Sequence, residues 1–207
     1  MAIKSTIKKK KKVWVPMYAP KFLNESFLGE SLVSDKQAMI GKSLTLNLSI
    51  FTRDMKKQST EVSFTVKSIV DNKGVTEVTG LSLTNGYVKR LVRRGKSKVE
   101  DSFTAKSKDG YTLRIKPIVV TNNVVNQSVA SKIRALTKEK LTALLQKNNA
   151  DEFFELLLQQ KSQKELKDVL SKLYPLRYVD VRVAQIVKRL SPKTKVEEKK
   201  EEVAVEQ

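Results

Sequence analysis

Apolar and polar residues alternate with a period of two along much of the first half of the chain. Leucine or isoleucine occupies every second position of residues 44–50, and valine or phenylalanine does so in residues 62–66. This alternation is typical of strands that bury one face. Asp71–Gly74 then has the composition of a hairpin turn into another strand over residues 75–84. The pattern predicts a β-meander.

A second hairpin is predicted further along. Its turn is Lys108–Gly110, which joins strands over residues 99–107 and 111–121. Arg114 and Lys116 alternate with apolar residues in the later strand, so these two cations are expected to face outward.

The period changes to that of a helix after Asn126. Apolar residues recur three or four positions apart through residues 126–175, which predicts a succession of helices. Asp151 is the expected N-cap of the second helix, and Ser162–Glu165 has the form of a capping box for the third.

Residues 176–187 alternate once more, with valines on one face and Asp180 and Arg182 on the other. A strand that follows helices usually returns to the sheet. We therefore expect an α+β protein with a curled or barrel-like, mostly antiparallel sheet, a helical C-terminal part and a returning late strand. The predicted organisation is a disordered basic N-terminal arm (1–12), a single body (13–190, with the sheet about 13–121, the helices about 126–175 and the return strand about 176–187) and a flexible charged tail (191–207).

Trp14 is the only tryptophan, and it lies in an extended segment with two prolines, Val13–Pro20. An indole can stack on a nucleic-acid base, but a single tryptophan beside valines is more often part of a core. We therefore expect Trp14 to be buried.

The composition limits the function. The 207 residues carry a formal net charge of +19 and are 40% hydrophobic, so a real core is expected beneath a basic surface that suits polyanions. The absence of cysteine and histidine removes thiolate zinc sites, imidazole bases and Ser-His or Cys-His pairs. We expect no catalytic residue, metal or cofactor. No apolar run approaches the roughly 20 residues of a membrane span, so we expect a soluble intracellular protein.

The cations are most concentrated between Asn85 and Pro117. Apolar residues at helical spacing should hold a short helix here against a core, so that the charges stand on a packed scaffold. The Arg93–Arg94 pair is followed by Gly95, which offers forked donors beside accessible backbone N–H groups for phosphates. Glu100, Asp101 and Asp109 are close enough in sequence to neutralise some of this charge. The cations of this segment are Lys89, Arg90, Arg93, Arg94, Lys96, Lys98, Arg114 and Lys116.

Such contacts position a nucleic acid without reading its sequence. The chain has no helix-turn-helix, zinc or glycine-rich phosphate-loop signature and no aromatic RNA-recognition strand, and we favour RNA over DNA. The run Lys8–Lys12 is interpreted as an arm along phosphates, with a solvated end or a localisation signal as the alternative.

Two blocks, Leu91–Asp101 and Lys108–Pro117, closely resemble the archaeal and eukaryotic small-subunit ribosomal protein family of the S3a type. The resemblance covers about Val13–Lys188, and the length is that of the shorter archaeal members. One departure is Leu81–Ser82, where the family often has His-Asp. Further blocks match in the right order: Trp14–Pro20 with Gly29 and Glu30, Leu83 and Thr84 with Tyr87, and Tyr174–Arg177 with Val181 and Arg182.

The resemblance implies a non-enzymatic structural constituent of the small ribosomal subunit, located in the cytoplasm on the platform near the mRNA exit, that supports subunit assembly and translation. The implied partners are small-subunit rRNA and neighbouring ribosomal proteins, with mRNA or initiation factors as further candidates, and neither membrane nor DNA. The expected RNA-binding residues are Lys8, Lys9, Lys10, Lys11, Lys12, Lys89, Arg90, Arg93, Arg94, Lys96, Lys98, Arg114, Lys116, Arg177 and Arg182.

Two functions of other classes stay open at this point. An RNA-processing enzyme would depend on carboxylates such as Asp101 or Asp109, with Mg²⁺ as cofactor. A protein-only adaptor would dock through the apolar residues Phe153, Phe154, Leu157 and Leu158.

Overall fold

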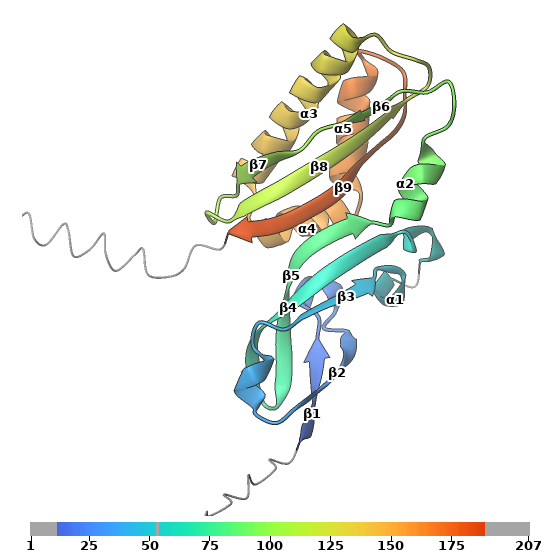
Figure 1. The fold of residues 1–207 in the computed structure, drawn as a ribbon. Helices are drawn as coiled ribbons and strands as arrows, with labels where there is room; N and C mark the ends of the chain where they lie inside the picture. The colour runs from blue at the N-terminus through green and yellow to red at the C-terminus, as the bar shows by residue number, and fades with distance from the viewer. Residues whose placement is uncertain (1–11, 53, 189–207) are drawn as a thin grey trace, which may run out of the picture. The chain divides into compact units, whose positions relative to one another are not determined.

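The computed structural model describes residues 12–52 and 54–188 (Figure 1). Nine strands and five α-helices lie in these ranges, which confirms the α+β class. The contacts between Cα atoms divide the described residues into two compact units, one that ends at Thr79 and one that begins at Gly80. Most of the predicted N-terminal arm, residues 1–11, and the predicted tail lie outside the described residues. The single-body organisation stays a prediction.

The first unit contains the predicted meander. Strand β3 pairs antiparallel with β4, and β4 pairs with β5. Asp71 and Asn72 both have positive φ (49° and 62°), as a two-residue hairpin turn of the favoured hand requires, so the predicted turn is confirmed. Strand β1 pairs antiparallel with β2 and, over two residues, parallel with β5. The strands are β1 (Val13–Tyr18), β2 (Phe27–Val33), β3 (Ser43–Asn47), β4 (Thr60–Val70) and β5 (Lys73–Leu83), and the short helices are η1 (Lys21–Leu23), η2 (Lys36–Met39), α1 (Ser49–Thr52) and η3 (Met55–Lys57).

Strand β3 is shorter than its alternation predicts. The side-chain oxygen of Asn47 accepts a hydrogen bond from the backbone N–H of Ser49 at 3.0 Å, and helix α1 begins there. A side-chain acceptor that satisfies a backbone donor in this way favours a turn over a continued strand. Ile50 therefore lies in a helix, and the prediction of a strand through residue 50 is wrong.

Trp14 is not in the core of this unit. Val15 and Met17 on strand β1 are buried. Trp14, the second residue of the strand, is 61% exposed. Successive side chains of a strand point to opposite faces, and the first unit buries only the face of Val15 and Met17. The prediction that Trp14 is buried is wrong.

Strand β8 is central in the second unit. It pairs antiparallel with β6 and β7 on one side and with β9 on the other, and β9 also pairs with the end of β5 at Gly80–Ser82. The late strand thus returns to the sheet, as predicted. The elements of this unit are α2 (Asn85–Leu91), β6 (Lys98–Glu100), β7 (Phe103–Lys106), β8 (Thr112–Thr121), α3 (Gln127–Lys147), α4 (Ala150–Leu158), α5 (Lys161–Ser171) and β9 (Leu176–Lys188).

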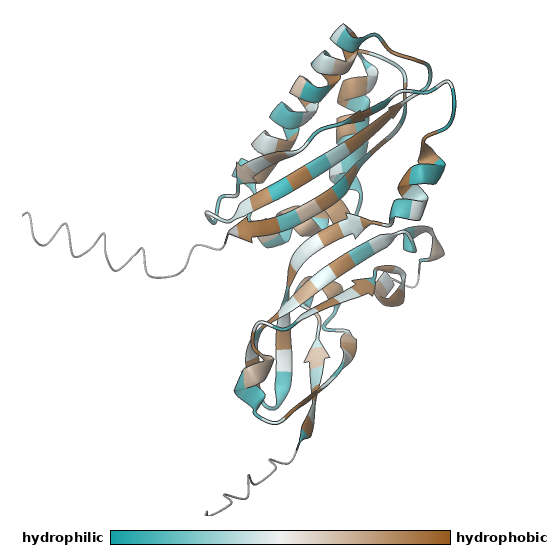
Figure 2. Ribbon diagram, viewed as in Figure 1, coloured by the Kyte–Doolittle hydropathy of each residue, from teal (hydrophilic) through white to brown (hydrophobic). Residues whose placement is uncertain are grey.

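The two faces of β8 have different coverings. Helices α3 and α5 lie on one side of β8 and β9 (Figure 1), where Leu113 and Ile115 are fully buried. Apolar and polar positions alternate along β8 (Figure 2), so Arg114 and Lys116 point the other way, as predicted. Ile118 lies on this second face and packs against α2. We call it the α2 face.

The helix starts differ from two sequence predictions. Asn149, not Asp151, is the N-cap of α4, and its backbone N–H donates to the Glu152 side chain at 3.0 Å in a capping box. Ser162 lies inside α5 and is buried, and the N-cap of that helix is Gln160 with positive φ (59°). The capping box thus lies at the start of α4 and not, as predicted, at the start of α5. Several polar residues precede the apolar stripe of each helix, so the pattern alone did not identify the right one.

Strand β9 contains a β-bulge at Arg182. Lys116 pairs with Val183 and Pro117 pairs with Val181, which leaves Arg182 without a partner on β8. Proline has no N–H to donate to a ladder, so it is tolerated inside a sheet at such an irregularity. The bulge shifts the phase of the strand, so Val183 shares the face of Lys116. The prediction that all the valines of this strand face one way is wrong for Val183.

Candidate nucleic-acid interface

Helix α2 is held against the sheet by apolar contacts. Val88 is buried with Leu83 of β5 and with Ile118 and Val120 of β8, and the partly buried Tyr87, Leu91, Val92 and Tyr178 pack around them. The apolar residues expected to anchor this short helix therefore do so. A seven-residue helix is marginal alone, so this packing is what keeps it folded.

A partly buried chain of hydrogen bonds also fixes α2 to β9. The Tyr87 hydroxyl donates to that of Tyr178 at 3.1 Å, and Tyr178 donates to the Asp180 carboxylate at 2.5 Å. Asp180 also accepts from Gln163 of α5 at 3.2 Å and from the backbone N–H of Val181 at 2.7 Å. Each polar side-chain atom of this hydrogen-bonded network thus has a partner. This is the condition under which such networks stabilise a fold.

The network changes the acidity of two of its members. Burial raises the pKa of the Asp180 carboxyl above its ordinary range, although the hydrogen bonds from Tyr178, Val181 and Gln163 oppose this shift. Burial, followed by the adjacent Asp180 carboxyl, raises the pKa of Tyr178 as well. Asp180 is buried and Tyr178 is half-buried, and both are structural supports of α2.

The cations of α2 and the loop behind it point to solvent. Lys89, Arg90, Arg93 and Arg94 are all exposed, and the Arg90 guanidinium lies 5.9 Å from the centre of the Tyr87 ring. Lys89, Arg93 and Arg94 form no ion pair or side-chain hydrogen bond with any residue that the structure describes. Their charges are therefore available to a ligand.

The loop that carries the arginine pair is tied to β8 directly after Gly95. Gly95 has φ of +78°, and Thr121 Oγ1 then accepts from the Ser97 N–H at 3.1 Å. The Thr121 N–H donates to the Ser97 carbonyl at 3.0 Å, and Lys96 Nζ lies 3.5 Å from the carbonyl oxygen of Asn122. The arginine pair is thus presented between a packed helix and an anchored strand.

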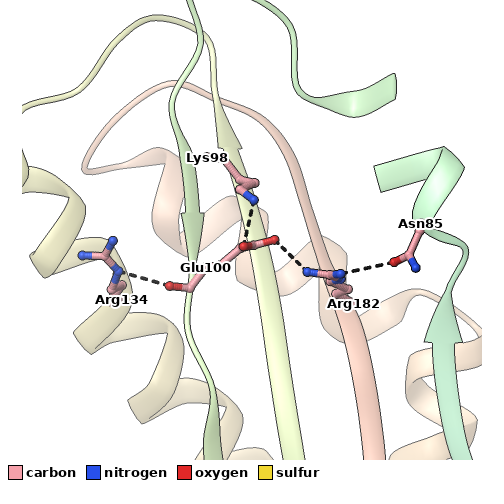
Figure 3. Close-up of polar contacts among 5 residues, drawn as sticks. All are labelled: Asn85, Lys98, Glu100, Arg134 and Arg182. Carbon is pink, nitrogen blue, oxygen red and sulfur yellow. Dashed lines mark hydrogen bonds and ion pairs between the residues drawn. The ribbon is translucent and has the colours of Figure 1, made fainter. Parts of the chain in front are cut away.

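Glu100 forms ion pairs with two of the predicted RNA-binding cations (Figure 3). Its carboxylate lies 2.9 Å from Lys98 Nζ and 3.3 Å from an Arg182 nitrogen, and Arg182 also donates to the Asn85 side chain at 3.2 Å. From the opposite side, Arg134 Nε of α3 donates to the Glu100 carbonyl at 3.2 Å. The expectation that acids of this segment neutralise some of its charge is confirmed for Glu100. Lys98 and Arg182 therefore have a structural partner in the protein itself.

The other predicted cations are distributed more widely. Arg114 and Lys116 lie on the α2 face, where Arg114 pairs with Gln185 and is exposed. Arg177 is also exposed, but it lines a pocket with Lys164 and Lys167 of α5. Lys12 is exposed at the start of the first unit. Lys8–Lys11 lie outside the described residues.

Sequence reasoning missed several polar residues of this region. Asn85, Gln163 and Asp180 gain their roles through partners far away in the chain, and the Arg182–Glu100 contact spans 82 positions. The one available signal was Tyr178 two positions before Asp180, which places both side chains on one face of a strand.

Comparison with known proteins decides the family. A sequence model of the ribosomal S3Ae family matches residues 3–190. The chain belongs to this family. It is 27% identical to the small ribosomal subunit protein eS1 of Halorubrum lacusprofundi over 203 residues, which are 96% of this chain and 94% of that protein. The eS1 proteins of Nanoarchaeum equitans (26% identical over 84% of this chain and 87% of that protein) and Desulfurococcus amylolyticus (29% over 88% and 86%) are similar.

Membership of the S3Ae family confirms the resemblance of the basic segment to a ribosomal protein and the expected ribosomal location. It also agrees with the distribution of charge. Residues 80–188 contain 22 lysines and arginines against 10 aspartates and glutamates, whereas residues 12–79 contain nine against seven. The surplus of cations within the described S3Ae fold is thus carried by the second unit.

The S3Ae fold weakens both alternative functions. Phe153, Phe154, Leu157 and Leu158 are all buried, so the predicted adaptor surface is wrong. Asp101 accepts the Ser102 N–H at 2.8 Å and Asp109 accepts the Ala150 N–H at 3.3 Å, which are contacts of turn and helix-start residues. In residues 12–52 and 54–188, no three acidic side chains gather as metal ligands, and no helix is both long and apolar enough to cross a membrane.

Proposed function

We propose that this protein is a structural constituent of the small ribosomal subunit that binds rRNA phosphates through the α2 face. The observation that carries the proposal is the set of exposed cations on α2 and its loop that have no ion-pair partner among the described residues. Lys89, Arg93 and Arg94 project from an element that is anchored by a buried core and a hydrogen-bonded network. Cations on a fixed scaffold lose less conformational entropy on binding than cations on a mobile tail would lose.

The proposed interface has a strong and a weak part. Arg90, Arg93 and Arg94 form its strong part because their guanidinium groups can bind phosphate oxygens in a bidentate manner. Lys98 and Arg182 form its weak part, since binding a phosphate there competes with Glu100. Arg114 and Lys116 extend the interface along β8.

The remaining parts of the proposal rest on the family alone. They are a position on the platform near the mRNA exit, contacts with neighbouring small-subunit proteins, support of subunit assembly and translation, and contacts with mRNA or initiation factors. The eS1 relatives carry the name of a small-subunit protein, and the match extends over nearly the whole of both chains.

The double substitution Arg93→Ala with Arg94→Ala tests the proposal. Binding to transcribed small-subunit rRNA is measured by filter retention across a potassium chloride series, with thermal unfolding measured in parallel. We expect weaker binding, a salt slope shallower by about 1.5 to 2, and an unchanged melting temperature, because two phosphate contacts are lost while the core is untouched.

Lys138→Ala with Lys140→Ala is the matched control, since these two lysines are exposed on α3 and remove the same charge. If both double substitutions weakened rRNA binding equally, the effect would be one of net charge and not of the arginine pair. Unaltered binding by the arginine variant would place the interface elsewhere.

A further inference from the structure

One face of the first unit carries exposed aromatic side chains that its own core does not use. Trp14 of β1 pairs directly with Leu32 of β2, and the two side chains are 61% and 41% exposed. Directly paired residues of antiparallel strands lie on the same face, so Trp14 and Leu32 form a continuous apolar surface. We call the solvent face of β1 and β2 the aromatic ribbon.

The aromatic ribbon has a second aromatic group at its other end. Tyr18 lies four positions after Trp14, about 13 Å along the strand, and therefore on the same face. Its ring packs edge-to-face against Phe27 of β2, with ring centres 6.1 Å apart. Phe27 remains 54% exposed, so this end also offers an aromatic surface to a ligand.

Cations lie at both ends of the aromatic ribbon. Lys73 Nζ lies 5.4 Å from the centre of the Tyr18 ring, and Lys12 is exposed two residues before Trp14. Two residues span at most about 7 Å, so the Lys12 backbone is close to the indole. Glu30 is the only acidic residue on β1 and β2. A surface that combines aromatic faces with flanking lysines is suited to bases joined by phosphates.

We propose that the aromatic ribbon binds an unpaired segment of the small-subunit rRNA by stacking a base on Trp14. The inference rests on the proposed function and adds a second contact of different chemistry. The α2 face neutralises phosphates, whereas the aromatic ribbon stacks bases. Stacking requires that the base is not already paired within a helix, so this contact selects single-stranded RNA.

Trp14 reports directly on its own contact because it is the only tryptophan in the chain. The full-length protein is titrated with a 12-nucleotide single-stranded RNA of mixed adenine and uracil, and its intrinsic fluorescence is followed. We expect quenching by the single strand and little quenching by the same RNA annealed to its complement. Equal quenching by the duplex would overturn the proposal.

Substitutions measured by fluorescence anisotropy of labelled RNA separate stacking from charge. Trp14→Ala should weaken binding of the single strand about fivefold or more, because a stacking contact is lost. The salt slope should stay unchanged, because every phosphate contact is kept. Trp14→Phe should retain most of the affinity. Met55→Ala is the control, since Met55 is 75% exposed and lies outside β1 and β2. Parental affinity of Trp14→Ala would overturn the proposal.

The same experiments distinguish failure of this inference from failure of the proposed function. If Arg93→Ala with Arg94→Ala weakens rRNA binding while Trp14→Ala does not, only the aromatic ribbon is excluded. If neither variant differs from the parent, both proposals fail.

Intact subunits test which RNA covers the indole. Small subunits washed free of mRNA are treated with an oxidant of exposed tryptophan, and oxidation of Trp14 is quantified by mass spectrometry. Protection that is lost after nuclease digestion supports an rRNA contact. Oxidation at the rate of the free protein, or protection that survives digestion, would overturn it and in the latter case assign the surface to a protein.

Discussion

Arg182 and Glu100 form an ion pair of 3.3 Å that joins β9 to β6 on the α2 face. Both side chains are about one-third exposed, and Glu100 holds Lys98 at the same time. Exposed or half-exposed ion pairs contribute little to stability, typically about 0–1 kcal/mol. The carboxylate therefore affects chiefly how much positive charge the surface offers to a polyanion.

Glu100→Gln should strengthen RNA binding. The substitution keeps the shape of the side chain, removes one negative charge and releases Lys98 and Arg182 for phosphates. We expect a higher affinity for small-subunit rRNA and a salt slope steeper by about 1.5 to 2, with a loss of at most about 1 kcal/mol of unfolding free energy. Filter retention in a salt series and urea unfolding measure the two effects.

Glu165→Gln on the exposed side of α5 is the control for this experiment, because it makes the same change of charge. A gain of equal size in the control would show that net charge, and not the release of two particular cations, governs the affinity.

The Asp180 carboxyl should make the protein less stable as pH rises. Its pKa is raised in the folded state by burial, so the folded protein retains a proton at pH values where the unfolded chain has lost it. The unfolding free energy then falls as pH rises from the ordinary aspartate pKa, about 4, through the raised folded pKa. Asp180→Asn removes this dependence.

The readout is the difference in unfolding free energy between the parent and Asp180→Asn, measured by urea unfolding from pH 4 upward. The parent should lose stability relative to the variant as pH rises. A difference that is constant with pH, or that grows in favour of the parent, would contradict a raised pKa.

Two glycines near α2 should respond to alanine in opposite directions. Gly95 has φ of +78° with open space around it, so Gly95→Ala costs only the backbone strain, about 1–2 kcal/mol. Gly86 lies in α2 without positive φ and also faces open space, so Gly86→Ala should stabilise by about 0.5–1 kcal/mol. Thermal unfolding of both variants tests this, and equal shifts would contradict it.

The elements themselves were largely predictable because their signals are local. The Asp71–Gly74 turn, the alternation in β4 and the apolar stripe of α3 each depend on neighbouring residues. The end of β3 and the start of α5 were predicted wrongly because a polar side chain near a boundary can bind more than one backbone group.

The side of a strand that becomes buried and the partner of each charged side chain were less predictable, because both depend on residues far away in the sequence. Trp14 is exposed since no other element in the described part of the chain covers its side of β1, and nothing in the residues around it signals this. The basic residues of the candidate site could be named from the sequence. Which of them are neutralised could not, since the Glu100–Arg182 contact joins residues 82 positions apart.

The bulge at Arg182 sets which residues of β9 face α2. Before this residue, even-numbered positions such as Asp180 lie on the α2 face, and after it odd-numbered positions such as Val183 do. Substitution of Arg182 leaves this change of phase in place. Deletion of the residue would restore a regular ladder, because the residues on either side of it already pair with neighbouring positions of β8, so the pairing with β8 and the burial of Ala184 would both be kept. Only the guanidinium that binds Glu100 would be lost, so the bulge adds one cation to the α2 face without disturbing the sheet.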